Sequence, residues 1–267
     1  MSDSAPTNQG THAHGLKYDL PHLFGRRRAI SSLAALTLVS AAGRGMAADG
    51  SCVAIPAETA GPFPADGSNR AAGQTVNVLQ ESGVMRDDLR TSFAGMSPVA
   101  EGVEVQLILH LVEAGTACTP LAGRAIYVWH CDAAGRYSLY EDRDRNYLRG
   151  LGVSDANGIV RLTTVFPGCY RGRWPHIHFE VFDRPADAVA GSAGRLTSQL
   201  ALPAAACNDV YARDPRYHNS VANLRGQSLA RDGIFRDNTP DEIEQQTLSL
   251  SGSPATGFEA RAVIGLG

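Results

Sequence analysis

Several kinds of sequence feature are scarce in this 267-residue chain, and each absence argues against a class of function. The formal net charge is −3, without the basic excess that marks a nucleic-acid-binding protein. Beyond residues 29–42 there is no long apolar run, so we expect no membrane span. Internal repeats and long low-complexity segments are lacking, and helical periodicity is weak. These absences favour a globular domain built of strands.

The chain has five cysteines but no Cys-x-x-Cys motif, which argues against a zinc ribbon or a thioredoxin-type centre. In an oxidising compartment five cysteines can form two disulfides and leave one thiol. The sequence alone does not choose among the pairings. We favour one bridge between Cys52 and Cys118, which would tie an N-terminal arm to the rest of the domain. The remaining cysteines are Cys131, Cys169 and Cys207.

Residues 1–47 are expected to be an export signal. Arg26-Arg27-Arg28 precedes an uncharged, mostly apolar stretch from Ala29 to Ala42, and the small residues around Ala47 suit signal peptidase. The apolar stretch is shorter than the roughly 20 residues that a membrane-spanning helix needs. Adjacent arginines favour the twin-arginine route over an ordinary secretory signal with a basic start. The mature protein would then be periplasmic or secreted.

After the signal, residues 48–100 are expected to form an irregular N-terminal arm, and residues 101–267 a single domain. Apolar residues alternate through Val103–Val112 and therefore share one face of a strand. Further strand-like segments, separated by Gly, Pro and Asp turns, are Ala125–His130, Ile159–Phe166 and Ile177–Phe182. The pattern predicts an all-β fold, an antiparallel β-sandwich with long loops. Residues 204–247 are polar and loop-rich, with a short helix expected near 241–247.

Two histidines, His176 and His178, stand two residues apart in a strand-like segment. On a strand both imidazoles point the same way, about 7 Å apart along the backbone, so two rings can reach one metal ion. The alternative is a pair of polar side chains on a solvent-facing strand. The apolar neighbours Trp174, Phe179 and Val181 argue against it, because an unpaired imidazole is costly in an apolar setting.

Two tyrosines follow turn-forming residues at strand ends: Tyr137 comes after Asp132–Gly135, and Tyr170 comes after Phe166–Gly168. Taken alone, each tyrosine would be interpreted as a half-buried core phenol. Together with the two histidines, they form a donor set that suits a hard, oxidised metal ion such as ferric iron. Anionic oxygen donors favour Fe(III) over Fe(II), whereas two thiolates would have suggested zinc or copper.

Three segments appear in the order Val128–Ser138, Phe166–Tyr170 and Arg173–Phe179. Their sequences are Val-Trp-His-Cys-Asp-Ala-Ala-Gly-Arg-Tyr-Ser, Phe-Pro-Gly-Cys-Tyr and Arg-Trp-Pro-His-Ile-His-Phe. In this order they resemble the intradiol ring-cleavage dioxygenases, the family of catechol and protocatechuate ring-opening enzymes. Gly61-Pro62-Phe63 fits the N-terminal arm of the same family. The Trp-His-Cys-Asp variant resembles exported members more than the cytoplasmic ones.

The resemblance implies one Fe(III) per chain, with a solvent hydroxide beside four protein ligands: Tyr137, Tyr170, His176 and His178. It implies that Tyr170 leaves the iron when substrate binds, that Arg173 lies beside the substrate ring, and that Gln199 lies near the site. The implied partners are a catechol-type small aromatic molecule and O2. The implied reaction opens the ring between its two hydroxyls and gives a muconate-type diacid. The resemblance does not imply an oligomeric state.

Two other functions stay open. One is an exported, non-catalytic β-sandwich module that binds a metal or an aromatic or sugar ligand. The other is a zinc- or copper-dependent hydrolase that uses the two histidines. The presence of Arg173 argues against the first, although this arginine would also suit a surface salt bridge. A hydrolase would normally use a carboxylate as general base, and Glu180 lies beyond His178. We expect His130 to support the core rather than to bind metal.

Overall fold

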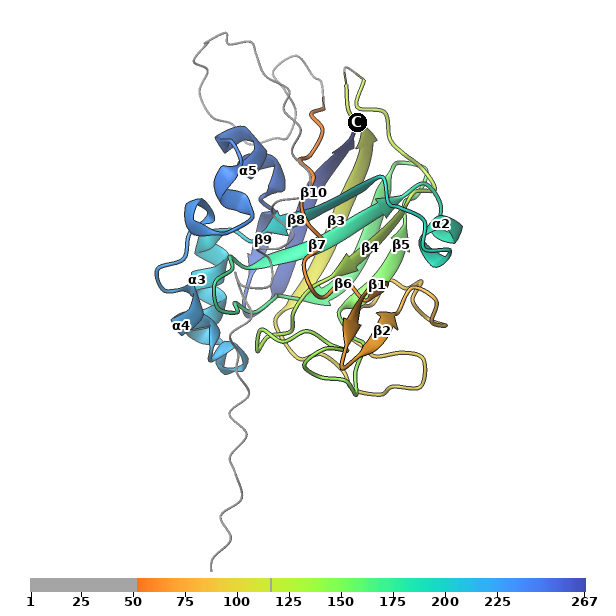
Figure 1. The fold of residues 1–267 in the computed structure, drawn as a ribbon. Helices are drawn as coiled ribbons and strands as arrows, with labels where there is room; N and C mark the ends of the chain where they lie inside the picture. The colour runs from red at the N-terminus through yellow and green to blue at the C-terminus, as the bar shows by residue number, and fades with distance from the viewer. Residues whose placement is uncertain (1–51, 116) are drawn as a thin grey trace, which may run out of the picture.

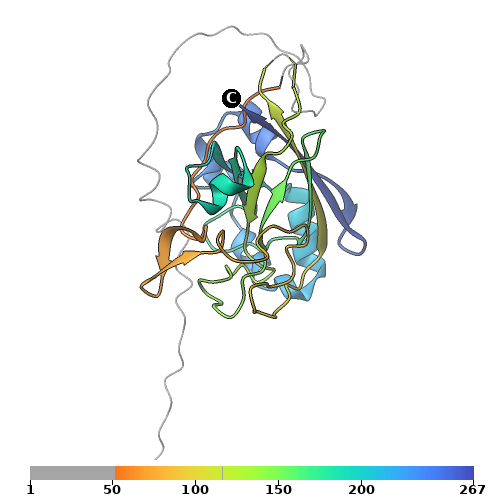
Figure 2. The same cartoon turned by 90° about the vertical axis from the view of Figure 1, so that its right-hand side faces the viewer.

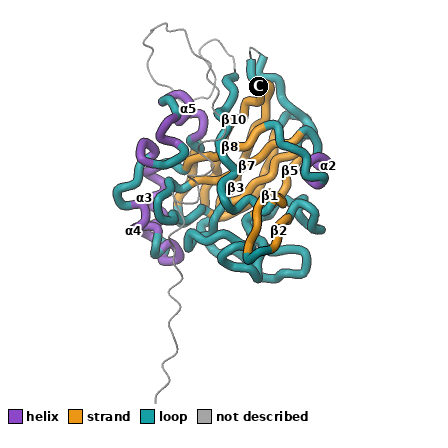
Figure 3. The backbone as a smooth tube through the Cα atoms, in the orientation of Figure 1, coloured by secondary structure: helices purple, strands orange, loops and turns teal. Residues whose placement is uncertain are grey.

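The computed structural model describes residues 52–115 and 117–267, so the predicted export signal at 1–47 lies outside the described residues. Two four-stranded sheets pack face to face, with the helices gathered mainly along one side (Figures 1 and 3). The β3 sheet has the order β6-β3-β10-β9, and the β7 sheet has the order β5-β4-β7-β8. The strands of the β3 sheet are β3 (Glu104–Glu113), β6 (Ile159–Val165), β9 (Ser249–Ser253) and β10 (Gly257–Leu266). Those of the β7 sheet are β4 (Ala125–Trp129), β5 (Arg149–Val153), β7 (His176–Phe182) and β8 (Leu196–Ala201).

The predicted all-β sandwich is confirmed, and β3, β4, β6 and β7 match the segments expected from the sequence. Strand pairs within the two sheets are antiparallel except for β3 and β10, which run parallel. A parallel pair needs a long crossover connection, and here almost the whole domain lies between the two strands. The arm is not wholly irregular, because it contains a hairpin of β1 (Asp66–Ala71) and β2 (Gln74–Asn77).

The apolar core lies between the two sheets and follows the alternation of the strands. Val105, Leu107 and Leu109 of β3 are fully buried there. Ile177 and Phe179 of β7 meet them from the opposite sheet and are equally buried. Burial of apolar area stabilises the fold by roughly 25 cal/mol per Å². Every second residue of β7 is therefore committed to stability, and the residues between them face outward.

Residues 204–247 contain more helix than the sequence predicted. The expected short helix is present as α5 (Pro240–Gln246), which begins with a capping box between Thr239 and Glu242. Helices α3 (Ala204–Arg213) and α4 (Ser220–Leu224) also form in this segment, and α2 (Pro185–Val189) lies at the opposite side (Figure 1). Within the described residues no helix has the length and apolar character to cross a membrane.

The N-terminal arm covers the outer face of the β7 sheet, the face turned away from the core. In Figure 1 the arm, drawn in orange, passes in front of the strands before it reaches the β1–β2 hairpin, which projects from the body in Figure 2. The Glu58 N–H donates to the Thr197 carbonyl over 2.8 Å, and the Tyr127 hydroxyl donates to the Pro64 carbonyl over 2.7 Å. The sandwich thus has a second, smaller apolar layer beneath the arm.

The predicted bridge between Cys52 and Cys118 is confirmed, and it ties the start of the arm to the connection between β3 and β4. The second bridge that the cysteine count allowed does not form within the described residues, because Cys131, Cys169 and Cys207 are free, buried thiols. Two of these thiols contact backbone carbonyls. The Cys131 Sγ lies 3.3 Å from the Gly168 oxygen, and the Cys169 Sγ lies 3.6 Å from the Arg173 oxygen.

Candidate metal centre

One row of side chains crosses the outer face of the β7 sheet beneath the arm. The strand register places Arg149 of β5, Trp129 of β4, His178 of β7 and Gln199 of β8 side by side. His176 precedes His178 by two residues on the same face, as the sequence predicted. The Trp129 ring stacks on the His178 imidazole with centroids 5.0 Å apart and planes 5° apart. The sheet therefore orients one imidazole by its register and by an aromatic neighbour.

The loops that carry Tyr137 and Tyr170 pack directly against each other. The Gly168 N–H donates to the Asp132 carbonyl over 2.9 Å. A side chain at Gly168 would place its Cβ 2.6 Å from the Ala133 carbonyl oxygen, closer than van der Waals contact allows. Only glycine permits this backbone-to-backbone approach. The Pro-Gly and Ala-Gly turns seen in the sequence therefore bring two tyrosines from distant loops to one place.

The four predicted ligands gather into one cluster of rings. The centroids of Tyr137 and Tyr170 are 5.8 Å apart, and those of His176 and His178 are 4.6 Å apart. The Nε2 atoms of the two histidines are 3.0 Å apart, and the Tyr170 Oη lies 3.3 Å from the Nε2 of His176. Tyr137 and both histidines are buried, whereas Tyr170 is partly exposed. Tyr170 therefore marks the side on which a small molecule would approach.

The two imidazoles are held in their neutral, metal-binding form. The Nδ1 of His176 donates to the Trp174 carbonyl over 2.5 Å, which leaves its Nε2 lone pair facing the cluster. Burial, and then the charge of Arg173, lowers the pKa of His176 to about 3. Burial, and then His176, lowers the pKa of His178 well below its ordinary value. Neutral imidazole nitrogen is the form that binds metal ions.

The environment of the Tyr137 phenol also indicates that these residues suit a metal ion. Its hydroxyl is buried and has no hydrogen-bond partner among the described residues, although buried polar groups are almost always satisfied. Burial, and then the nearby Tyr170, raises the pKa of Tyr137 well above its ordinary value. Ionisation of this phenol therefore needs a cation beside it, and metal binding would release its proton. Two neutral imidazoles and two phenols are a donor set that fits a hard trivalent ion.

No group of three or more His, Cys, Asp or Glu side chains that could hold a metal ion occurs in the part of the chain that the structure describes. The ring of His178 contacts the phenol of Tyr137, and the ring of His176 contacts the phenol of Tyr170.

Arg173 lies beside this cluster in a buried ion pair, so the surface salt bridge considered from the sequence was wrong. Its Nε is 2.9 Å from the Asp232 carboxylate, and its Nη2 donates to the Gln199 Oε1 over 2.6 Å. Asp232 also accepts the Trp174 N–H over 2.6 Å. Burial would raise the pKa of Asp232, but the charge of Arg173 and the hydrogen bonds hold it below the usual range. The guanidinium is thereby fixed in orientation.

Asp232 is the residue of this site that the sequence did not reveal. It lies in the polar segment before α5, 59 residues after Arg173, and no local pattern distinguishes it from its neighbours. The one available signal was indirect, since an arginine in an apolar motif needs a counter-charge somewhere. His130 is buried and bonds the Cys131 carbonyl and the Thr164 hydroxyl over 2.8 and 2.7 Å.

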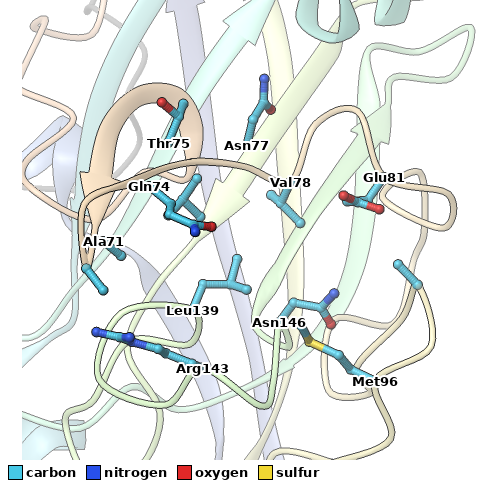
Figure 4. A pocket seen from close by; sticks show the side chains of 13 residues that line it. Ala71, Gln74, Thr75, Asn77, Val78, Glu81, Met96, Leu139, Arg143 and Asn146 are labelled. Atoms are coloured by element: carbon cyan, nitrogen blue, oxygen red, sulfur yellow. The ribbon is translucent and has the colours of Figure 1, made fainter.

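One cavity lies away from the ring cluster. It has a volume of about 520 Å³ and lies between the β1–β2 hairpin and the loop around Arg143 (Figure 4). Thr75, Asn77 and Asn146 line it, and none of the predicted site residues does. A second cavity of about 400 Å³ adjoins Glu180. The geometry of the ring cluster, and not the presence of an open cavity, identifies the site.

Comparison with known proteins agrees with this fold. The family model described as "Dioxygenase" matches residues 87–204, which include all four clustered rings, Arg173 and Gln199. A catechol 1,2-dioxygenase from Pseudomonas sp. (strain EST1001) is 27% identical over 151 residues, covering 49% of this chain and 45% of that protein. The protocatechuate 3,4-dioxygenase beta chain of Burkholderia cepacia is 31% identical over 125 residues, covering 42% of this chain and 49% of that protein.

These matches show that residues 87–204 of this β-sandwich are similar to dioxygenase domains, including those of catechol and protocatechuate dioxygenases. The matched region spans about half the length of the two curated relatives. An intradiol ring-cleavage dioxygenase from Tetranychus urticae shares the fold with a TM-score of 0.59. It is 21% identical, and the alignment covers 80% of this chain and 95% of that one.

Proposed function

We propose that this chain is an exported, non-haem Fe(III) dioxygenase. It opens a catechol-type ring between its two hydroxyls with O2 and releases a muconate-type diacid. The observation that carries the proposal is the convergence of two phenols and two neutral imidazoles beside one buried arginine. The match of residues 87–204 to the dioxygenase family model supports it, because the matched segment contains these residues.

The metal ligands of the proposed enzyme are Tyr137, Tyr170, His176 and His178. Ferric iron bound there would supply a Lewis acid that lowers the pKa of a catechol hydroxyl. The carbonyl of Trp174 keeps the His176 ring in the tautomer that points Nε2 at the site.

The remaining chemistry belongs to the side chains around the ligands. Tyr170 is partly exposed, and as a tyrosinate its oxygen accepts a proton from one hydroxyl of the entering catechol. Arg173 faces the ring, held by Asp232 and Gln199, and stabilises negative charge that develops on it. The amide of Gln199 also donates to the Thr59 carbonyl over 2.8 Å, which binds the arm to this side of the site. The arm excludes water from the buried rings.

The first experiment is the visible spectrum of the purified mature protein before and after addition of catechol, paired with metal analysis. A phenolate-to-Fe(III) charge-transfer band that shifts with catechol is expected. Tyr137→Phe should change the band, whereas Tyr217→Phe, which alters a buried phenol in the core, should not.

Three results would contradict the proposal in different ways. A protein that stays colourless after anaerobic iron loading and air oxidation would exclude the tyrosinate–iron site. Zinc or copper in place of iron would favour the hydrolase. A normal band without oxygen uptake across a panel of catechols would favour the non-catalytic binding module.

A further inference from the structure

Two arginines are among the largest fully buried side chains, and their partners differ. Arg173 is paired with the Asp232 carboxylate. Arg149 of β5 is also completely buried, but within the described residues it makes no ion pair. Burying a charge without a counter-charge is costly, and such groups are rare unless other contacts compensate for the lost hydration. The contacts of Arg149 therefore need an explanation.

The Arg149 guanidinium is held by neutral oxygens from three separate segments. Its Nη1 donates to the carbonyls of Phe63 and Pro64 in the arm, over 2.9 and 3.0 Å. Its Nη2 donates to the Ser138 carbonyl and its Nε to the Ser138 hydroxyl, both over 3.0 Å. The Tyr127 hydroxyl of β4 lies 3.3 Å from Nη1. The planar guanidinium of Arg149 thus joins the arm, the loop that contains Ser138 and the sheet.

The two segments joined by Arg149 are the ones that confine Tyr137. Ser138 follows Tyr137 in the chain. The Phe63 ring packs on the Tyr137 ring with centroids 4.8 Å apart. The guanidinium therefore holds both the backbone beside this phenol and the aromatic wall against it. A lysine in its place would keep the charge but would lose the fork that bonds both segments at once.

We propose that Arg149 is a positioning residue that clamps the arm onto the Tyr137 loop and so fixes the Tyr137 phenol in the metal centre. The clamp itself is a property of the metal-free protein. Its effect on metal chemistry rests on the proposed function. None of the hydrogen bonds of Arg149 within the described residues goes to a side chain of the four ring ligands, so it acts through Phe63 and Ser138.

The test compares Arg149→Met and Arg149→Lys with Arg161→Met and Arg161→Lys. Arg161 lies on β6 in the other sheet, with a side chain that is 64% exposed. In the metal-free proteins, hydrogen exchange of residues 59–66 and 136–142 is measured against that of β3. Both Arg149 variants should exchange at least about tenfold faster in those two segments, with β3 unchanged, because a local opening is made easier.

In the iron-loaded proteins, the Arg149 variants should keep their iron content and show a displaced charge-transfer band. Their kcat/KM should fall about 10–100-fold, as for other residues that support metal ligands. The Arg161 variants should match the wild type in every measurement. Lysine gives a second variant in case the methionine variant does not fold.

Unchanged exchange in both segments would overturn the clamp. So would faster exchange spread equally over β3, which would show a general loss of stability. An unmoved band and unchanged kcat/KM, together with faster local exchange, would overturn the link to Tyr137. A wild-type protein without any charge-transfer band would instead overturn the proposed function, while the exchange result would still decide the clamp.

Discussion

The two faces of the β7 sheet are built by the same strands and differ in chemistry. Toward the core, β7 presents Ile177, Phe179 and Val181, all fully buried against apolar side chains of the β3 sheet. Toward the arm, the alternate positions present His176 and His178, which are buried beside phenols and a guanidinium. A period of two residues lets one seven-residue strand serve both purposes. The core face supplies the rigidity on which the geometry of the other face depends.

The largest effect is expected from removing a ring on the arm side. His178→Ala should abolish iron binding, the charge-transfer band and turnover, because it deletes one of the proposed ligands. The metal-free variant should still fold, since the strand and its core face remain intact. Metal analysis and the visible spectrum check this, with His110→Ala on β3 as the control. Iron retained at wild-type level would contradict the ligand assignment.

A substitution at the next residue of β7 should have the opposite result: it should lower stability but preserve the metal centre. Phe179→Ala opens a cavity in the core and should lower the free energy of unfolding by about 3–5 kcal/mol. While folded, the variant should keep its charge-transfer band. Denaturant unfolding of the metal-free protein measures the change without the contribution of bound metal. A loss of iron greater than the loss of folded protein would show that the two faces are not separable.

The third comparison concerns charge on the arm side. Arg173→Lys keeps the positive charge but loses the planar fork that meets Asp232 and Gln199. Turnover should fall about 10²–10³-fold with iron retained, because a group aimed at developing charge is displaced. Steady-state kinetics and iron content provide the check, and Arg195→Lys at the partly exposed end of β8 serves as the control. Near-normal turnover would exclude the role of Arg173.

The smallest effect should come from Glu180, which continues the outward-facing series of β7 beyond His178. Burial, and then the charge of Asp66, raises the pKa of Glu180 from its ordinary value of 4.5 to about 7. The folded protein therefore holds this proton more tightly than the unfolded chain does. The contribution of Glu180 to stability should therefore be fully present below about pH 4.5 and should be lost as pH rises through about 7.

Glu180→Gln should remove that decline and gain about 1–2 kcal/mol near pH 8, after discounting for the partly solvated side chain. Unfolding curves of the metal-free proteins between pH 4 and 8 measure it. Glu113→Gln, at an exposed carboxylate, provides the matched control. Parallel pH profiles of wild type and Glu180→Gln would contradict the assignment.

Features of the fold that depend on local sequence were predictable, and those that depend on distant partners were not. Alternation in β3 and β7 identified the strands and the shared direction of His176 and His178, because side-chain period is a property of a few consecutive residues. The two tyrosines and Arg173 were recognised from short segments, and the structure places them beside the histidines.

The partners of these residues could not be predicted in the same way. Asp232 meets Arg173 across 59 residues, and Phe63 meets Arg149 across 86 residues. Neither contact produces a periodic pattern in the amino-acid sequence. The parallel pairing of β10 with β3 is equally non-local. The number of disulfides was left open by the sequence for a related reason, since whether thiols pair depends on how distant loops pack and not on the number of cysteines.

The bridge between Cys52 and Cys118 has a further consequence for the arm. Residues 58–65 can be regarded as an intramolecular ligand of the β7 sheet, joined to it by a short tether that begins at Cys52. A short tether keeps the effective concentration of such a segment high, and a longer one lowers it. Formation of the disulfide therefore shortens the tether of this segment. It raises the effective concentration at which Thr59, Phe63 and Pro64 bind to the sheet. This disulfide, although remote from the ring cluster, therefore influences the fraction of time that the arm covers the rings.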